Sequence, residues 1–278
     1  MLSYRHSFHA GNHADVLKHV VLVDLLQYLL KKDKPLDYID THAGAGLYSL
    51  SGHQSAKTQE YLGGIGRLEP NDWPELSDYL SIVNSCQIGA GLSHYPGSPE
   101  IAQRILRRSD RRWLFELHPH DAALLSDHYQ GLRHTRVEQT DGLKGLLSLL
   151  PPASKRALVL IDPSYEIKED YVAVIKAVIK AWTKFRTGVY AIWYPVVDRT
   201  RIDDMEARLK RAGVKSVQRF ELAVLSDSAG RGMTGSGMIV INPPWTLFSR
   251  MEQLLPKLSE ALGETGQASF RCDVIAKE

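Results

Sequence analysis

An acidic residue directly follows a short apolar run near the middle of the chain. The run spans residues 157–161, and Asp162, Pro163, Ser164 and Tyr165 come next. A run that is apolar on both faces is typical of a central strand in a parallel sheet that helices cover. Ligands bind at the carboxyl ends of such strands, so the acid and the aromatic ring are placed for chemistry. A capped turn is the alternative, since Asp-Pro sequences commonly form turns.

The first predicted strand, residues 36–41, ends in a turn that could hold a cofactor. Asp40 is followed by Gly44 and Gly46, whereas a dinucleotide-binding fingerprint needs a third glycine at the position of Ser49. No Lys-Ser or Lys-Thr pair completes a phosphate-binding loop here. The turn therefore fits S-adenosylmethionine better than NAD or FAD, because it lets the backbone approach the amino-acid end of that cofactor.

Acids at the ends of the next two predicted strands support the same cofactor. Glu116 lies in the strand 113–117, where a carboxylate would accept hydrogen bonds from both ribose hydroxyls. Asp141 and Gly142 follow the strand 135–139, at the expected place of the adenine ring. One such acid says little, since Asp and Gly are common after strands, but the ordered series is considerably more specific.

The Asp162 motif indicates which atom receives the methyl group. It is a variant of the Asp-Pro-Pro-Tyr motif of amino-group methyltransferases. An exocyclic amine on adenine is a poor nucleophile, because its lone pair is delocalised into the ring. The Asp162 carboxylate and the Pro163 carbonyl can accept its two hydrogens and aim the lone pair at the methyl donor. Tyr165 can then stack on a base that has been flipped out.

A second stretch, INPPW at residues 241–245, matches this motif class more literally. It follows the seventh predicted strand, whereas the motif should follow the fourth. We therefore expect it to be structural, a proline stop after an edge strand. Carbon methylation through a thiolate is also disfavoured, because neither Cys86 nor Cys272 lies on these loops.

Length and composition indicate an ordinary cytoplasmic protein. The chain has 278 residues, of which 44% are apolar and 24% charged, with a net charge of +2. No stretch of about 18 apolar residues occurs, so membrane spanning is not expected. The two cysteines have no CxxC partner, which indicates neither a disulfide framework nor a thiolate metal site.

An arginine cluster gives weak support for nucleic-acid binding, since such clusters are usually solvated. Its members are Arg104, Arg107, Arg108, Arg111 and Arg112.

Apolar periodicity predicts one α/β domain, residues 1–278, with a doubly wound sheet of seven strands. A helix over residues 12–32 with Asn12 as its cap precedes the first strand. About 70 residues separate the first two strands, so we expect an inserted small helical subdomain at about 52–94. The glycine-rich residues 226–237 predict a flexible loop or a long hairpin connection. The strands are expected at 36–41, 113–117, 135–139, 158–162, 189–193, 218–224 and 238–242, and two later helices at 169–186 and 203–212.

These motifs together resemble one family nearly end to end, the RlmJ-type adenine-N6 methyltransferases of 23S (large-subunit) ribosomal RNA. The blocks that carry the resemblance are MLSYRHSFHAGNHADVLKH, DTHAGAG, YPGSP, ELHP, DG, IDPSYE, IWYPVV, RGMTGSGM and INPPW. The resemblance implies a Rossmann-like class I S-adenosylmethionine-dependent methyltransferase with a mostly parallel sheet. It also implies a monomer that acts on an adenine in naked or immature ribosomal RNA.

The resemblance also implies a set of site residues. Asp162, Pro163 and Tyr165 would form the catalytic turn, and Tyr4 would contact the RNA. No metal is expected, because Asp15 is the only acid near the N-terminal histidines. The cofactor site would comprise Lys18, His19, His42, Gly44, Ser98, Glu116, Asp141, Gly142 and Asp162.

The sequence departs from the family pattern at one position of the motif, and two other functions remain open. Ser164 stands where a second proline is expected, which frees φ and adds a backbone N–H, so the rate of catalysis is in question. The motif selects an amine and not its carrier, so a DNA adenine or protein glutamine N-methyltransferase is one alternative. A weakly active RNA-binding assembly factor is the other.

Overall fold

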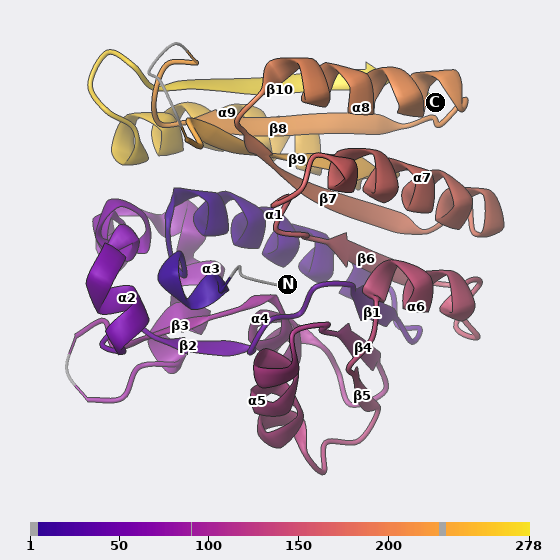
Figure 1. Ribbon diagram of the computed structural model, residues 1–278, viewed down its shortest axis with the longest axis horizontal. Helices are drawn as coiled ribbons and strands as arrows, with labels where there is room; N and C mark the ends of the chain where they lie inside the picture. The colour runs from indigo at the N-terminus through magenta and orange to yellow at the C-terminus, as the bar shows by residue number, and fades with distance from the viewer. Residues whose placement is uncertain (1–4, 90, 228–231) are drawn as a thin grey trace.

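Eight strands form one central sheet in the order β10-β8-β9-β7-β6-β1-β4-β5 (Figure 1). The computed structural model of the protein describes residues 5–89, 91–227 and 232–278. Five neighbouring strands are parallel: β1 (Asp37–Asp40), β4 (Arg111–Phe115), β5 (Thr135–Glu138), β6 (Ala157–Ile161) and β7 (Val189–Val196). Antiparallel pairs join β7 to β9 (Gly235–Ile241), β9 to β8 (Val217–Ala223) and β8 to β10 (Ser269–Ala276). The expected Rossmann-like α/β arrangement is confirmed.

Helices cover both faces of the sheet, which is why its central strands are apolar throughout. Every residue of β1 and β6 is buried. Along β6, Leu158 and Leu160 belong to one apolar core, and Val159 and Ile161 belong to the other. The first core is covered by α1 (His13–Leu30), α4 (Ser98–Ile105), α5 (Pro119–Tyr129) and α9 (Leu247–Leu262), and the second by α6 (Gly142–Leu149), α7 (Glu169–Lys184) and α8 (Arg199–Arg211).

The N-terminal helix α1 begins where the sequence predicts. The Asn12 side chain accepts hydrogen bonds from the backbone N–H groups of Ala14 and Asp15, both at 3.0 Å. Most of the helix is buried, including the charged side chains of Asp15 and Lys18. Although α1 is apolar on several sides, no helix in the described ranges has the length and apolar character needed to cross a membrane. Buried charges on such a helix need partners, and the site supplies them.

The long connection between β1 and β4 contains a second, two-stranded sheet. Its strands β2 (Leu47–Ser49) and β3 (His94–Pro96) pair in antiparallel fashion. The sequence did not predict them, because three residues are too few for a periodic pattern and the partner strand is distant. The described residues between them form α2 (His53–Thr58), α3 (Ser77–Ser85) and 3₁₀ helices at Glu60–Gly63, Ile65–Arg67, Pro70–Asp72 and Pro74–Leu76.

The sheet has one strand more than the seven that the sequence predicts. The missed strand is β10, in which no side chain is buried, so it lacks the apolar signature of an inner strand. It lies at the edge of the sheet and pairs only with β8. The prediction for residues 226–237 was also partly wrong, because Gly235, Ser236 and Gly237 belong to β9.

Close packing, and not a need for flexibility, explains why residue 237 is a glycine. A Cβ atom at Gly237 would lie 2.1 Å from Cζ of Tyr194 on the neighbouring strand β7. Glycine therefore lets the Tyr194 ring lie flat against the backbone of β9.

We predict that Gly237→Ala lowers the free energy of unfolding by about 1–3 kcal/mol, because the added methyl group forces Tyr194 or the strand to move. Chemical denaturation measures the change. Gly63→Ala is the matched control, since nothing lies within 4 Å of a Cβ atom there. Equal stability of the two variants would show that the sheet accommodates the methyl group.

Candidate active site

A cavity of about 720 Å³ opens at the carboxyl ends of β1, β4 and β6. This is the edge at which open parallel sheets bind ligands. All the predicted cofactor and catalytic residues line it, although they come from six separate stretches of the chain. They are Lys18, His19, His42, Gly44, Ser98, Glu116, Asp141, Gly142, Asp162, Pro163 and Tyr165.

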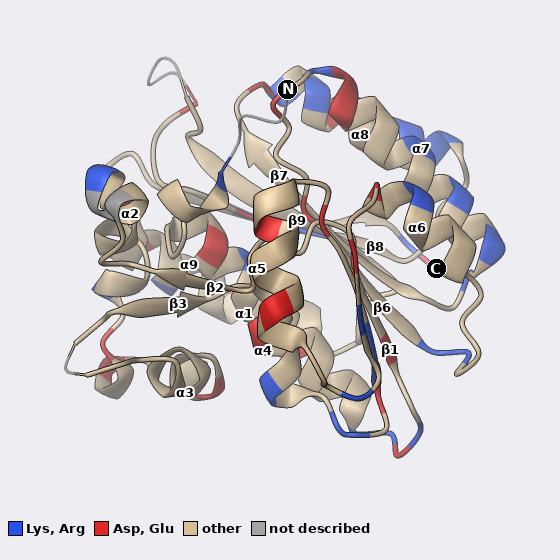
Figure 2. Ribbon diagram, turned by 60° about the horizontal axis from the view of Figure 1, so that its bottom comes forward, with Lys and Arg blue, Asp and Glu red and all other residues tan. Residues whose placement is uncertain are grey.

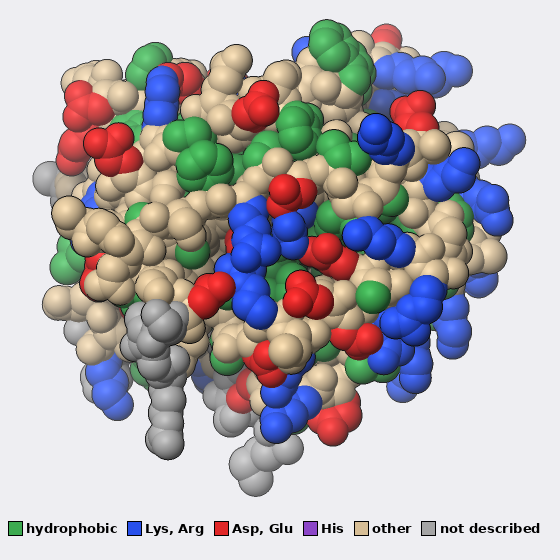
Figure 3. Space-filling view, turned by 90° about the horizontal axis from the view of Figure 1, so that it is seen from above, with side chains coloured by type: hydrophobic (Ala, Val, Ile, Leu, Met, Phe, Trp, Pro, Cys, Tyr) green, Lys and Arg blue, Asp and Glu red, His purple; other side chains and the backbone are tan. Residues whose placement is uncertain are grey.

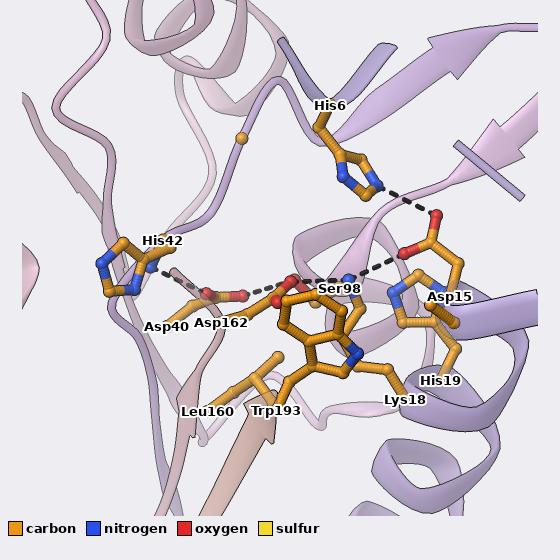
Figure 4. Close-up of polar contacts among 12 residues, drawn as sticks. His6, Asp15, Lys18, His19, Asp40, His42, Ser98, Leu160, Asp162 and Trp193 are labelled. Carbon is orange, nitrogen blue, oxygen red and sulfur yellow. Dashed lines mark hydrogen bonds and ion pairs between the residues drawn. The ribbon is translucent and has the colours of Figure 1, made fainter. Parts of the chain in front are cut away.

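A buried lysine joins two carboxylates at the base of the cavity (Figure 4). Lys18 Nζ lies 2.6 Å from Asp162 Oδ2 and 2.7 Å from Asp15 Oδ1. His6 Nε2 lies 2.9 Å from the other oxygen of Asp15. Burial disfavours the charged form of Lys18, but the two carboxylates outweigh it and raise the lysine's pKa. The structure thus places Lys18, predicted for the cofactor, in contact with Asp162, the predicted catalytic acid.

The same contacts act oppositely on the two acids. Burial would raise the pKa of Asp15, but His6 and Lys18 hold it well below its usual range. Burial raises the pKa of Asp162, and Lys18 opposes that rise only in part. Among the described residues, no hydrogen-bond donor contacts Asp162 Oδ1. One oxygen of this carboxylate is therefore anchored, and the other is available to a substrate.

The turn after Asp162 has an unusual backbone at Tyr165. Its φ is +52°, a left-handed value that a bulky side chain rarely adopts. The hydroxyl donates a hydrogen bond to the carbonyl of Trp193 at 2.8 Å, and the ring packs 4.4 Å from the ring centre of Tyr171. These contacts hold the strained conformation, as is common at functional sites. Pro163 is buried beside it, and Ser164 also lines the cavity.

The glycine turn and Glu116 are joined directly. Gly44 N–H donates to Glu116 Oε2 at 2.8 Å, and His118 N–H donates to Glu116 Oε1 at 2.7 Å. Gly44 has a φ of +62°, and a Cβ atom there would lie 2.0 Å from the Tyr48 hydroxyl. Burial raises the pKa of Glu116. Since each carboxylate oxygen has two lone pairs, both can still accept a hydrogen bond from a ligand.

His19 brings an unsatisfied polar atom to the cavity. Its Nδ1 lies 2.7 Å from the Tyr95 hydroxyl, whereas its buried Nε2 has no partner among the residues that the structure describes. Burial holds the pKa of His19 well below its usual value, so the ring is neutral. A neutral ring whose Nδ1 accepts from Tyr95 presents an Nε2–H donor. Such a donor fits a carboxylate such as the amino-acid end of S-adenosylmethionine.

Ser98 lines the cavity, and Asp40 lies directly beneath it. The Ser98 hydroxyl donates to Asp40 Oδ2 at 2.7 Å, and Tyr38 donates to the same oxygen at 2.7 Å. The backbone N–H of His42 donates to Asp40 Oδ1 at 3.3 Å. Asp40 is fully buried and is not among the residues that line the cavity. Its role is to fix the first turn and the start of α4.

The expected adenine side of the cavity is formed by His42, Asp141 and Gly142. Burial lowers the pKa of His42 to about 4, so its ring is neutral at physiological pH. Asp141 caps α6 by accepting from the N–H groups of Leu143 and Lys144, at 3.0 and 3.2 Å. A Cβ atom at Gly142 would lie 2.0 Å from the carbonyl oxygen of Thr41, so only glycine fits here.

Sequence reasoning missed several residues that line the cavity, among them His6, Asp15 and Trp193. The i, i+3 spacing of Asp15 and Lys18 on one helix is a signal that would have indicated a pair. Trp193 lies within β7, and its place at the end of the strand predicted over residues 189–193 was the available clue. No local pattern connects His6 to Asp15. Tyr4, predicted to contact RNA, lies outside the described residues.

None of the residues 241–245 lines this cavity, but the strand before them is not the predicted edge strand, because β9 lies between β7 and β8. Because β9 is antiparallel to β7, its carboxyl end lies at the opposite edge of the sheet. The Asn242 side chain donates to the carbonyls of Arg186 and Gly188, both at 2.7 Å, and Trp245 is 79% exposed. Asn242 thus closes a turn at the far edge.

The parallel core, the glycine turn after its first strand and the acid after its second define the Rossmann-like fold of class I S-adenosylmethionine-dependent methyltransferases. The family model described as "Ribosomal RNA large subunit methyltransferase D, RlmJ" matches residues 33–275, and the chain belongs to that family.

Relatives match over the whole chain. It is 50% identical over 280 residues to "Ribosomal RNA large subunit methyltransferase J" of Escherichia coli strain K12, covering 100% of both chains. It is 46% identical over 281 residues to the protein of that name from Haemophilus influenzae, again covering 100% of both. A crystal structure of a Legionella pneumophila protein, 37% identical, superposes with a TM-score of 0.86 over 96% of this chain and 98% of that one.

We predict that Asp40 makes the folding stability depend on pH. Burial raises its pKa from 3.8 to about 6, although three donors contact it. Because the folded pKa exceeds the unfolded one, its stabilising contribution is complete below about pH 4 and is lost as the pH rises through 6. The pKa difference corresponds to roughly 3 kcal/mol.

Chemical denaturation of the wild type and of Asp40→Asn between about pH 4 and pH 8 tests whether stability falls as the pH rises. The wild type should lose stability relative to the variant as the pH rises. A constant difference between the two proteins across this range would refute the assignment.

Proposed function

We propose that this protein transfers a methyl group from S-adenosylmethionine to the N6 amino group of an adenine in 23S ribosomal RNA, in the cytoplasm and as a monomer. The observation that carries the proposal is the Asp162 carboxylate, with one oxygen held by Lys18 and the other without a donor among the described residues. The two relatives described as ribosomal RNA large subunit methyltransferases support the substrate class.

The geometry of the Asp162 turn suits an aromatic amine. Lys18 fixes the carboxylate from below, so Oδ1 can accept one N–H of the amine without the side chain rotating away. The carbonyl of Pro163 offers the second acceptor. Holding both hydrogens draws the lone pair out of conjugation with the ring and directs it along one line. Tyr165 and Trp193, whose ring centres lie 6.0 Å apart, give this end of the cavity an aromatic wall for a flipped base.

The residues that would hold S-adenosylmethionine follow from the cavity. When bound, this cofactor supplies an electrophilic methyl group on a sulfonium sulfur. The Nε2–H of His19 fits its carboxylate, and Glu116 fits its ribose hydroxyls. Asp141 and Gly142 border the space for its adenine ring. Because a Cβ atom at Gly142 would collide with the Thr41 carbonyl, glycine lets the start of α6 lie close against the first turn.

The RNA that contains the target adenine must be held outside the cavity. Lys168 and Arg201 lie at its lining, and Arg201 stacks 5.5 Å above the ring of Tyr171. On the face seen from above, Lys and Arg side chains mix with Asp and Glu over the middle and gather toward the right (Figure 3). We expect Lys168 and Arg201, at the cavity itself, to position the RNA phosphates.

We predict that Asp162→Asn lowers the rate of methyl transfer to unmodified 23S RNA by at least about 100-fold, because an amide group would face the hydrogens of the amine. Cofactor affinity should change little, but stability should fall, because Lys18 loses one of its two carboxylate partners, so the rate is compared per folded molecule. Asn242→Ala in the 241–245 stretch is the matched control, and its rate per folded molecule should stay near that of the wild type. Equal turnover of Asp162→Asn and the wild type would end the assignment of this acid.

We predict that Glu116→Ala weakens S-adenosylmethionine binding by about 1.5–3 kcal/mol for each hydrogen bond removed, measured by calorimetry. Glu116→Gln keeps one acceptor oxygen, so its effect should be smaller. Unchanged affinity in both variants would mean that the ribose lies elsewhere.

A further inference from the structure

A second cavity, of about 700 Å³, lies at the amino ends of the parallel strands, opposite the active site. Its walls are the loops that lead into β4 and β5, and the amino ends of these parallel strands point away from the first cavity. Figure 2 shows Lys and Arg segments of the ribbon at this lower end of the sheet. Four arginines and a histidine line the cavity, and none of its lining residues is acidic. The lining includes the polar side chains of Gln103, Arg107, Arg108, Arg112, Arg133 and His134.

Arg112 is the buried centre of this cavity, with only 5% of its surface exposed. Its Nε donates to the Thr135 hydroxyl at 2.7 Å, and its Nη2 donates to the carbonyl of Arg133 at 3.1 Å. Among the described residues, its Nη1 has no hydrogen-bond acceptor, and no carboxylate forms an ion pair with the group. Burial lowers the pKa of Arg112, and Asp110, which forms its ion pair with Arg107, opposes that effect only in part.

Ion pairs within the fold account for some of the arginines in this region, but not for all of those that line the cavity. Arg104 pairs with Glu100, and Arg107 pairs with Asp110 while donating to the carbonyl of Lys34. Arg108 and Arg133 are exposed, and within the described part of the chain neither has an acidic partner. Three guanidinium groups, those of Arg108, Arg112 and Arg133, thus border one cavity and form no ion pair with any acid in the described ranges.

An unsatisfied amide adds an independent observation. The Oε1 atom of Gln103 is buried and has no hydrogen-bond partner among the described residues. The two ends of a Gln amide are interchangeable in assignment, so this position can present an N–H donor as readily as an oxygen. A ligand that accepts hydrogen bonds would satisfy both Gln103 and Arg112.

We propose that this second cavity is a binding site for phosphate groups, separate from the methyl-transfer site. Phosphate oxygens match the planar fork of a guanidinium and accept several hydrogen bonds at once. The charge of Arg112 would gain a counter-ion, and Arg108 and Arg133 would close over it from the loops. The phosphate comes either from a small free anion or from the backbone of an RNA that reaches around the sheet. The site does not depend on the proposed function.

The test uses the full chain and two variants. Arg108→Ala/Arg133→Ala changes exposed residues only, so folding should persist, and Arg112→Gln removes the buried charge while keeping an amide near Thr135. Arg211→Ala, an exposed arginine on α8, is the matched control. Inorganic pyrophosphate is the free-anion probe, followed by calorimetry, and an unmodified 23S RNA fragment is the second probe, followed over a salt series.

Binding of pyrophosphate that weakens at least tenfold in both variants, but not in the control, identifies a free anion as the ligand. If only RNA affinity falls, with a salt slope smaller by about 1 for each phosphate that is no longer neutralised, the ligand is the RNA backbone. Unchanged binding of both probes in both variants overturns the proposal. Unaltered S-adenosylmethionine affinity in the variants shows that the weaker binding does not arise in the first cavity.

Discussion

The contact of Lys18 with Asp15 and Asp162 is the interaction on which the active site depends. It joins α1 to the end of β6, two elements that local sequence does not connect. A buried ammonium is costly unless carboxylates surround it, and each carboxylate is costly without the ammonium. The three groups therefore require one another. This mutual requirement fixes the rotation of α1 on the sheet and, with it, the position of Asp162, the proposed catalytic acid.

Around this contact, backbone constraints shape the rest of the cavity. Gly44 and Gly142 stand where any Cβ atom would collide, with a tyrosine hydroxyl in one case and a carbonyl in the other. Tyr165 holds a left-handed backbone because its hydroxyl is tied to Trp193. The cavity is thus formed by close approach of chain to chain, and rigid walls of this kind position a substrate better than mobile side chains do.

The antiparallel half of the sheet supports the wall of the site from behind. The hydroxyl of Tyr194 donates to Glu221 at 2.9 Å, and Arg199 binds the same buried carboxylate at 2.6 Å. Gly237 allows the Tyr194 ring to lie over β9. This network holds the end of β7, whose neighbouring residues Trp193 and Pro195 line the cavity. Strands added beyond the parallel core therefore serve the site although they contribute no acid to it.

The sequence by itself determined the parallel core, the order of acids after its strands and the motif at Asp162, because these are local patterns of apolar runs that end in polar residues. Only the tertiary structure decided that Lys18 binds Asp162, that β9 runs antiparallel and carries Asn242 away from the cavity, and that buried Arg112 forms no ion pair with the acids that the structure describes. Each of these depends on which distant segments become neighbours. Apolar periodicity reports which side chains are buried, but not what they are buried against, because strand pairing and helix packing are set by contacts far apart along the chain.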